Sequence, residues 1–175
     1  MSESAENAGD CVSQLCPACG LCCNGVLFGD VELQRGDNPK RLAELGMELF
    51  RKGRKQCFHQ PCACFDGKLC QIYAERPARC RTFECKLLQK TEAGEVTVPM
   101  ALKSIADARR VTDAVRKLVR ELGNNDESVP LNRRYAAVAA KPIDLAMDDQ
   151  CAGRRGELMQ AVDKLVKVLE RDFLG

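Results

Sequence analysis

Four cysteines occupy eight positions in the segment CPACGLCC, residues 16–23, and two of them are adjacent in the chain. A cluster of this density leaves open a set of disulfides, a redox-active pair or a metal site. The whole chain has 12 cysteines in 175 residues, and ten of them lie between Cys16 and Cys85. The chemistry of cysteine therefore dominates what the first half of the chain can fold into.

The start of the chain bears on the state of these cysteines. The segment MSESAENAGD, residues 1–10, has neither the basic stretch nor the apolar stretch of a secretory signal. No apolar run in the chain is long enough to span a bilayer. We therefore expect a cytoplasmic protein without a membrane partner, whose thiols are reduced and serve a metal or catalysis rather than disulfides.

The distribution of cysteine predicts three parts of the chain. Residues 1–10 are expected to form a flexible tail, residues 11–90 a Cys-rich region and residues 91–175 a helical region, in which Cys151 stands alone. Aromatic residues make up 5% of the chain and tryptophan is absent. Part of the stability is therefore expected to come from something other than side-chain packing.

The Cys-rich region has few signals for regular structure. Residues 26–33, VLFGDVEL, are partly alternating and predict a short strand or hairpin. Asn38 and Pro39 suit the N-cap and first position of a helix that would run to about Phe50. The basic run RKGRK, residues 51–55, would then follow the end of that helix. We expect an irregular α+β fold here, followed by an all-helical C-terminal part.

The helical region is predicted from apolar residues at three- and four-residue spacing. Such stripes run over residues 100–122 and 156–173, and a weaker helical segment covers residues 132–140. The stripes indicate a helical layer that packs on itself or on the Cys-rich region. A protein partner or a homodimer seam along these helices is the alternative.

The spacing of the first four cysteines favours metal coordination. A C-x2-C step lets a tight turn direct two sulfurs at one ion, and Gly20 gives the backbone freedom to follow. Cys22 and Cys23 are different, because neighbouring side chains of an extended chain point to opposite sides. We expect these two thiols to serve different metals, or one of them to have another role.

A second group of ligand types follows in residues 57–85. It comprises six further cysteines and the only histidine of the chain: Cys57, His59, Cys62, Cys64, Cys70, Cys80 and Cys85. Ten thiols exceed the four ligands of one zinc ion and suffice for two centres. Because zinc and iron–sulfur clusters both accept four thiolates, spacing leaves one or two zinc ions, a 4Fe-4S cluster or another iron–sulfur cluster open.

Positive charge gathers around the last two cysteines of this group. Arg76, Arg79, Arg81 and Lys86 lie within a few residues of Cys80 and Cys85. Four thiolates around a divalent ion leave a charge near −2, which cations nearby would soften. The alternative is that these side chains are ordinary surface cations.

The same residues resemble a known family. CPACGLCC, QPCACF, CQIYAERPARCR and FEC are similar to the two motif blocks of the CxxCxxCC zinc- or iron-chelating domains, the YkgJ-type cysteine cluster proteins. The resemblance covers about residues 16–88. It implies metal or cluster binding by Cys16, Cys19, Cys22, Cys23, Cys62, Cys70, Cys80 and Cys85, with Cys64 as a ninth candidate. Cys57 and His59 lie outside its motifs and are weaker candidates.

One branch of the family resembles flagellin lysine methylases, which makes a methyltransferase-like enzyme an alternative function. The chain has no glycine-rich turn for a nucleotide cofactor. Tyr73 could serve as an acid or base, but we expect a packed ring whose hydroxyl is satisfied. Whether the protein is an enzyme stays open, with binding favoured over catalysis.

Two further functions are left open by single motifs. The basic residues 51–55 beside Cys57 suit a zinc-stabilised nucleic-acid-binding module. The net charge of +2 and the lack of interleaved aromatic residues, however, give little support to nucleic-acid binding. Cys16 and Cys19 form a C-P-x-C step that is typical of thiol redox proteins, but the expected βαβ context is missing. The sequence therefore predicts a metal-binding protein whose structural, redox or regulatory role is unresolved.

Overall fold

The computed structural model describes residues 3–142 and 149–175, and it has an α+β fold as the sequence predicts. The elements of the first half are α1 (Glu3–Cys19), β1 (Asp30–Glu32), α2 (Pro39–Glu44), β2 (Leu49–Lys52), β3 (Lys55–His59), the 3-10 turn η1 (Tyr73–Glu75), α3 (Ala78–Thr82) and α4 (Lys86–Glu92). The second half is helical in its described part, with α5 (Val98–Glu121), α6 (Leu131–Ala140) and α7 (Asp149–Asp172).

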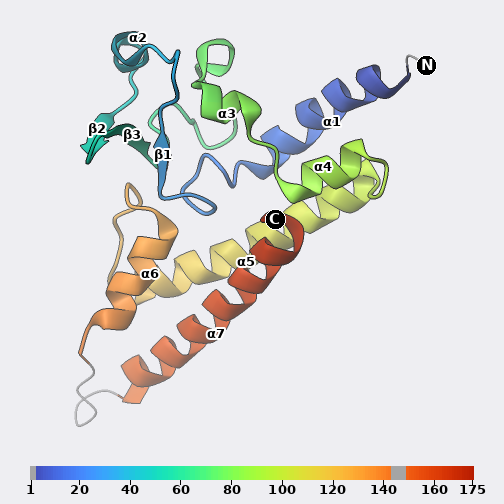
Figure 1. Ribbon diagram of the computed structural model, residues 1–175. Helices are drawn as coiled ribbons and strands as arrows, with labels where there is room; N and C mark the ends of the chain where they lie inside the picture. Colours follow the sequence, from blue (N-terminus) through green and yellow to red (C-terminus); the bar gives the residue numbers. More distant parts are fainter. Residues whose placement is uncertain (1–2, 143–148) are drawn as a thin grey trace.

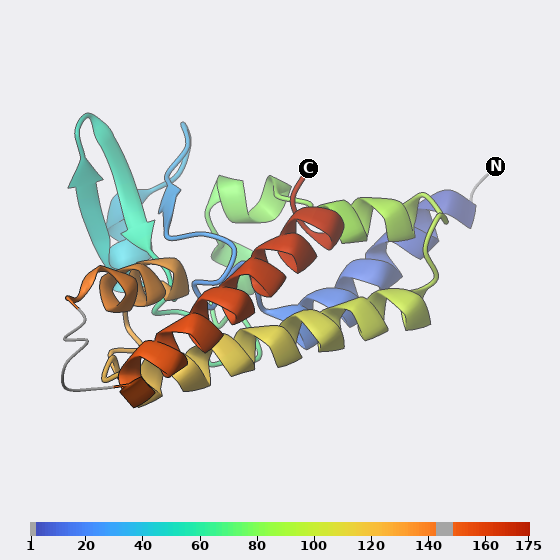
Figure 2. The same cartoon turned by 90° about the horizontal axis from the view of Figure 1, so that it is seen from below.

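The long helices form one layer and the sheet lies beside it. Helices α5 and α7 run antiparallel along each other, α1 packs against α5, and α6 lies near the sheet end of this layer (Figure 1). Figure 2 shows the same helices from below, with the hairpin of β2 and β3 standing away from them. The loops between α1, β3 and α4 hold most of the cysteines at the junction of the two parts.

Two separate hydrophobic cores stabilise the two parts. The helical core joins α1, α4, α5, α6 and α7 and includes Val115, Leu158 and Phe173, each with at most 1% of its surface exposed. The sheet core is smaller and consists of Val31, Leu42, Met47, Phe58, Cys64 and Ile72. The sheet core is small, and the other buried apolar side chains of the Cys-rich region, among them Leu15, Leu21 and Leu88, lie in the helical core.

The sheet has three antiparallel strands in the order β1-β3-β2. Val31 faces Phe58 across the first pair of strands, and Phe50 faces Cys57 across the second. Of the predicted strand over residues 26–33, only β1 forms. The hairpin of β2 and β3 was not predicted from the sequence.

The start of α2 confirms the predicted cap, whereas its predicted end at about Phe50 is wrong. The Asn38 side chain accepts a hydrogen bond from the Arg41 N–H at 3.1 Å. The helix ends at Glu44 because Gly46, at φ +90°, donates to the Ala43 carbonyl and Met47 donates to the Leu42 carbonyl. This pair of bonds is the Schellman C-cap, which glycine favours because it adopts a left-handed conformation without strain.

The basic residues 51–55 accordingly lie on the β2–β3 hairpin and not after a helix end. All five residues are exposed. Lys52 pairs with Asp30 at 3.2 Å and Lys55 with Glu32 at 2.7 Å, so part of the positive charge is paired with carboxylates of strand β1.

Helix α1 begins at Glu3, inside the segment for which the sequence predicts a flexible tail. Its apolar side is shown by Cys11 and Leu15, which are buried in the helical core. No apolar stripe predicts this helix from the sequence, because its first turns are rich in polar residues. The division of the chain at residues 10 and 90 stays a prediction.

The predicted helices of the second half are confirmed. Residues 100–122 correspond to α5, residues 132–140 to α6, and residues 156–173 to α7, which begins earlier, at Asp149. Gly123, at φ +82°, ends α5 with the same type of cap as α2. Among the described residues, none of these helices combines the length and apolar character that crossing a bilayer requires.

Candidate metal centre

The first four cysteines lie where α1 ends and turns. Cys16 and Cys19 are in the last turn of α1, and the Gly20 N–H donates to the Cys16 carbonyl at 3.1 Å. Gly20 then reverses the chain at φ +65° and accepts a hydrogen bond from the Cys23 N–H at 3.0 Å. The premise that Cys22 and Cys23 lie in extended chain is therefore wrong, because both belong to this turn.

Gly20 is also the point where the turn touches the second cysteine segment. A Cβ atom at this position would lie 2.8 Å from the ring of Phe65. The turn therefore needs glycine both for its left-handed backbone and for the close approach of the ring.

Replacing Gly20 by alanine is expected to destabilise the Cys-rich region. Gly20→Ala should cost about 1 kcal/mol for the left-handed backbone and a further 1–3 kcal/mol, roughly, for displacing Phe65. Gly53→Ala is the matched control, since Gly53 has φ +62° and nothing within 4 Å of the added Cβ. Thermal unfolding of the two variants measures the difference, and equal losses would show that the Phe65 contact does not constrain the turn.

Backbone bonds hold the second cysteine segment against the first. The Cys62 N–H donates to the Cys23 carbonyl at 2.9 Å, and the Gln71 N–H donates to the Cys64 carbonyl at 2.8 Å. Cys80 follows on α3, and Cys85 is the N-cap residue of α4. Loops that are far apart in sequence thus converge on one place.

The thiols fall into two neighbourhoods. In the first thiol set, made up of Cys16, Cys19, Cys22 and Cys85, burial raises the pKa of Cys16 to about 11 and that of Cys19 to about 12. Negative charge on Cys22 and Cys85 adds to both shifts, and burial together with Cys22 also raises the pKa of Cys85. The four sulfurs are therefore close enough to act on one another electrostatically.

The second thiol set is made up of Cys23, Cys62, Cys70 and Cys80, and Cys64 lies beside it. Burial raises the pKa of Cys80 to about 12, with Cys62 and Cys70 among the neighbours that add to the shift. Burial also raises the pKa of Cys62 to about 11, and Cys64 and Cys70 add to it. Cys64 is itself part of the sheet core, and its thiol lies 3.5 Å from the Leu45 carbonyl.

The adjacent cysteines connect the two sets. The Cys23 thiol hydrogen-bonds to the Cys22 sulfur, which lowers the pKa of Cys22 to about 7 and raises the pKa of Cys23. Beyond this bond, Cys22 interacts with Cys16, Cys19 and Cys85 and also raises the pKa of Cys80, whereas Cys62 and Cys80 act on Cys23.

Arg76 is the cation that the structure brings to the thiols. Its charge lowers the pKa values of Cys16, Cys22 and Cys80, so it acts on both sets. Arg79 and Arg81 are exposed on α3. The Arg76 guanidinium also lies over the ring of Tyr73, 4.0 Å from its centroid.

Tyr73 and the two weaker ligand candidates have other surroundings. Tyr73 is 52% exposed, so the expectation of a packed ring is wrong. Cys57 is buried on β3 opposite Phe50 and Glu32. The His59 Nδ1 atom lies 3.0 Å from an Asp30 carboxylate oxygen, and its ring stacks on Phe50 at 3.8 Å. The described contacts of His59 are thus with the sheet.

The two thiol sets are neighbourhoods and not closed coordination shells. Within residues 3–142 and 149–175, no three Cys, His, Asp or Glu side chains are arranged as a finished metal site. The donor chemistry nevertheless fits a metal, since each set supplies four soft sulfur ligands, the number that zinc and iron–sulfur clusters take.

Fold and thiols together define a cysteine-rich region joined to a helical layer. Comparison with protein families agrees, because residues 15–99 match the CxxCxxCC model, described as a putative zinc- or iron-chelating domain. The match confirms the resemblance seen in the motifs of this part of the chain. The comparisons with curated proteins and with solved structures found no match.

Proposed function

We propose that the Cys-rich region binds two metal centres, one in each thiol set. The observation that carries this proposal is the division of the sulfurs at Cys22 and Cys23. Cys22 acts on Cys16, Cys19 and Cys85 of the first set and on Cys80 of the second, whereas the neighbours that act on Cys23 are Cys22 itself and Cys62 and Cys80 of the second set. Eight thiols in two sets of four meet the needs of two tetrahedral centres, with Cys57, Cys64 and His59 left over.

The position of the sets suggests a structural role for both centres. Cys19 and Cys85 pack against the helical core, whereas Cys62, Cys70 and Cys80 pack against the sheet core. A centre in each set would tie one core to the turn at residues 20–23. The metal would then join two parts that share little apolar surface.

Zinc and an iron–sulfur cluster both suit these ligands. Zinc is redox-inert and would give a purely structural centre, while a cluster would add electron transfer. Arg76 lies where a cation would offset the negative charge of either kind of centre. Elemental analysis, sulfide determination and a visible spectrum after anaerobic purification distinguish them.

Single-cysteine variants test the division of the ligands. Cys22→Ala and Cys23→Ala are each expected to lose one of two metal equivalents, because each removes a ligand from a different set. Cys64→Ala is the matched control, a buried cysteine beside the second set, and it should retain both equivalents. Metal content of the purified proteins is measured by elemental analysis.

Two results would contradict the proposal. One is full metal content in Cys22→Ala or Cys23→Ala, which would show that the altered thiol is no ligand. The other is a wild-type protein that binds a single metal or cluster, which would show that the eight sulfurs do not form two centres.

A further inference from the structure

A cavity of about 280 Å³ lies between the Cys-rich region and the helical region. Its wall includes Cys19 and Asn24 from the turn after α1, Pro61 and Phe65 from the loop after β3, and one face of α5. The segment before α6 and Arg134 of α6 close it. A space of this size is near the lower end of those that hold small organic ligands.

The α5 face of this cavity is charged. Arg109, Thr112, Asp113 and Arg116 stand at positions i, i+3, i+4 and i+7 and therefore share one side of the helix. With Arg134, three guanidinium groups meet in the lining, against the two carboxylates of Asp113 and Glu127. The lining thus has a formal excess of positive charge.

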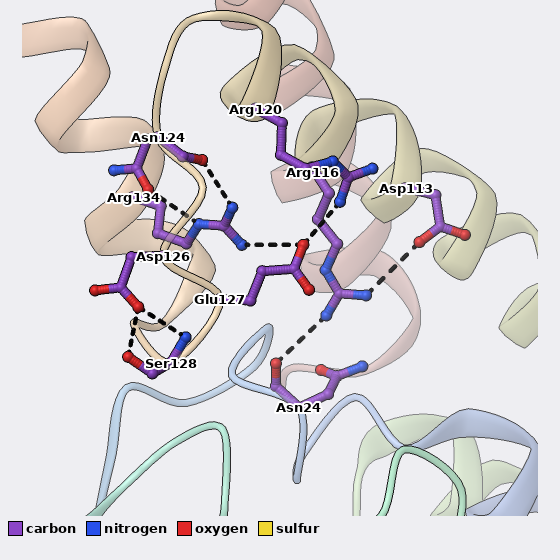
Figure 3. Close-up of polar contacts among 9 residues, drawn as sticks. All are labelled: Asn24, Asp113, Arg116, Arg120, Asn124, Asp126, Glu127, Ser128 and Arg134. Carbon is purple, nitrogen blue, oxygen red and sulfur yellow. Dashed lines mark hydrogen bonds and ion pairs between the residues drawn. The ribbon is translucent and has the colours of Figure 1, made fainter.

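The carboxylates neutralise Arg116 and Arg134 only loosely (Figure 3). Arg116 lies 3.6 Å from Asp113 and 3.4 Å from the Asn24 carbonyl. Glu127 is 4.0 Å from Arg134 but 2.8 Å from Arg120, so its charge is mainly engaged elsewhere. The guanidiniums at the cavity therefore have capacity to bind an additional anion.

Arg134 is the most buried of these cations. Its side chain is 2% exposed, and its Nη2 atom donates to the Asn124 carbonyl at 2.9 Å. Burial lowers the pKa of Arg134, and the positive charges of Arg116 and Arg120 lower it further. A buried cation among other cations is stabilised when an anion joins them.

Thr112 adds a second, independent observation. It is 1% exposed, and its Oγ1 atom has no hydrogen-bond partner among the described residues. A helical threonine commonly bonds to the carbonyl four residues earlier, as Thr91 does to Leu87 at 2.8 Å. An unpaired buried hydroxyl is destabilising unless a bound group forms a hydrogen bond with it.

We propose that this cavity binds a small molecule with an anionic oxygen group, a carboxylate or a phosphate. Arg116 and Arg134 hold its oxygens, and the Thr112 hydroxyl donates a further hydrogen bond. Because Cys19 belongs to the same lining, the bound anion lies beside the first thiol set and links the metal-binding domain to the helical region.

Isothermal titration and thermal unfolding of the full, metal-loaded chain test this site. The probes are inorganic phosphate and succinate, with chloride at the same ionic strength as the reference. Either anion is expected to bind saturably and to raise the unfolding midpoint with concentration. Binding of one anion alone supports the site and identifies the ligand group.

Two variants and a control localise the binding. Arg116→Gln and Thr112→Val are each expected to weaken binding by about tenfold or more, since each removes a hydrogen bond to a charged group. Thr112→Val should leave the anion-free protein at least as stable as wild type, because it removes an unpaired hydroxyl. Arg110→Gln is the control, as Arg110 is an exposed residue of α5 outside the cavity lining.

The inference is overturned if neither anion binds saturably or raises the unfolding midpoint more than chloride does. It is also overturned if Arg110→Gln weakens anion binding as much as Arg116→Gln. Metal content is determined on the same samples. Anion binding by a protein with fewer than two metal equivalents supports the anion site and contradicts the two metal centres. Two metal equivalents without anion binding support the two metal centres and contradict the anion site.

Discussion

Removing the metal is expected to unfold the Cys-rich region while α5 and α7 keep their helical structure. The binding free energy of a structural thiolate centre is largely folding free energy, on the order of 10 kcal/mol for zinc in small domains. The sheet core, built around Phe58 and Ile72, is too small to replace it. The helical core is larger, because α5 and α7 contribute most of it, including Val115 and Leu158, while Leu21 and Val26 join it from the loops between the cysteines.

Hydrogen exchange before and after chelation measures the different response of the Cys-rich region and of α5 and α7. Protection of the sheet strands, residues 49–59, should be lost, and that of residues 98–121 should largely remain. Addition of zinc, or reconstitution of the cluster, should restore the protection. Equal protection in the two states would contradict a structural role for the metal.

The dependence on pH should have opposite signs with and without metal. In the metal-free protein, burial raises the pKa of Cys16 and Cys62 to about 11 and of Cys19 and Cys80 to about 12, from 9.0. Above pH 9 the unfolded chain therefore loses protons that a metal-free folded chain would keep, so from about pH 9 to 12 rising pH adds to the unfolding that metal removal causes. With metal bound the sulfurs are thiolates, so stability falls as the pH decreases and protons compete for them.

Phe173→Ala is expected to destabilise the helical core by about 3–5 kcal/mol. The ring is 1% exposed, and its loss leaves a cavity between α7 and its neighbours. The backbone carbonyl of Phe173 also accepts a hydrogen bond from the Lys86 N–H at 3.2 Å, next to Cys85. The variant should therefore also lower the metal content of the first thiol set.

Denaturant unfolding and elemental analysis check the two effects. Met159→Ala serves as the control, because Met159 lies on α7, the helix that Phe173 directly follows, with 54% of its surface exposed and should change stability by about 0.5 kcal/mol or less. If Phe173→Ala lost stability without losing metal, the contact between α7 and the chain at Cys85 would not support the first set.

The predictable parts of the fold were those determined by short-range patterns. The stripe over residues 100–122 predicted α5, because a helix buries one side at three- and four-residue spacing. Asn38 and Pro39 predicted the start of α2, but the Gly46 cap and the strand after it were missed. A strand as short as β2 depends on its partner β3 for its hydrogen bonds, and the sequence of neither segment alone predicts this pairing.

The candidate site likewise has a part that the sequence predicted and a part that it did not. The motif CPACGLCC and the cysteines from Cys62 to Cys85 predicted the resemblance that the family model matches over residues 15–99, because thiol density and spacing are local properties of the chain. The cavity between α5 and the turn after α1 had no such signal. Its arginines and Thr112 come together only when residues 109–116 pack beside residues 124–134.

By itself, the sequence determined that this protein has thiol ligands in excess of one metal centre and an amphipathic helical region after them. The tertiary structure decided which thiols are neighbours, placing Cys22 with Cys85 and Cys23 with Cys62, and which charges surround them. The physical reason is that ligand type and helical periodicity are set by neighbouring residues, whereas burial and electrostatic interaction depend on distances between loops that the chain brings together only on folding.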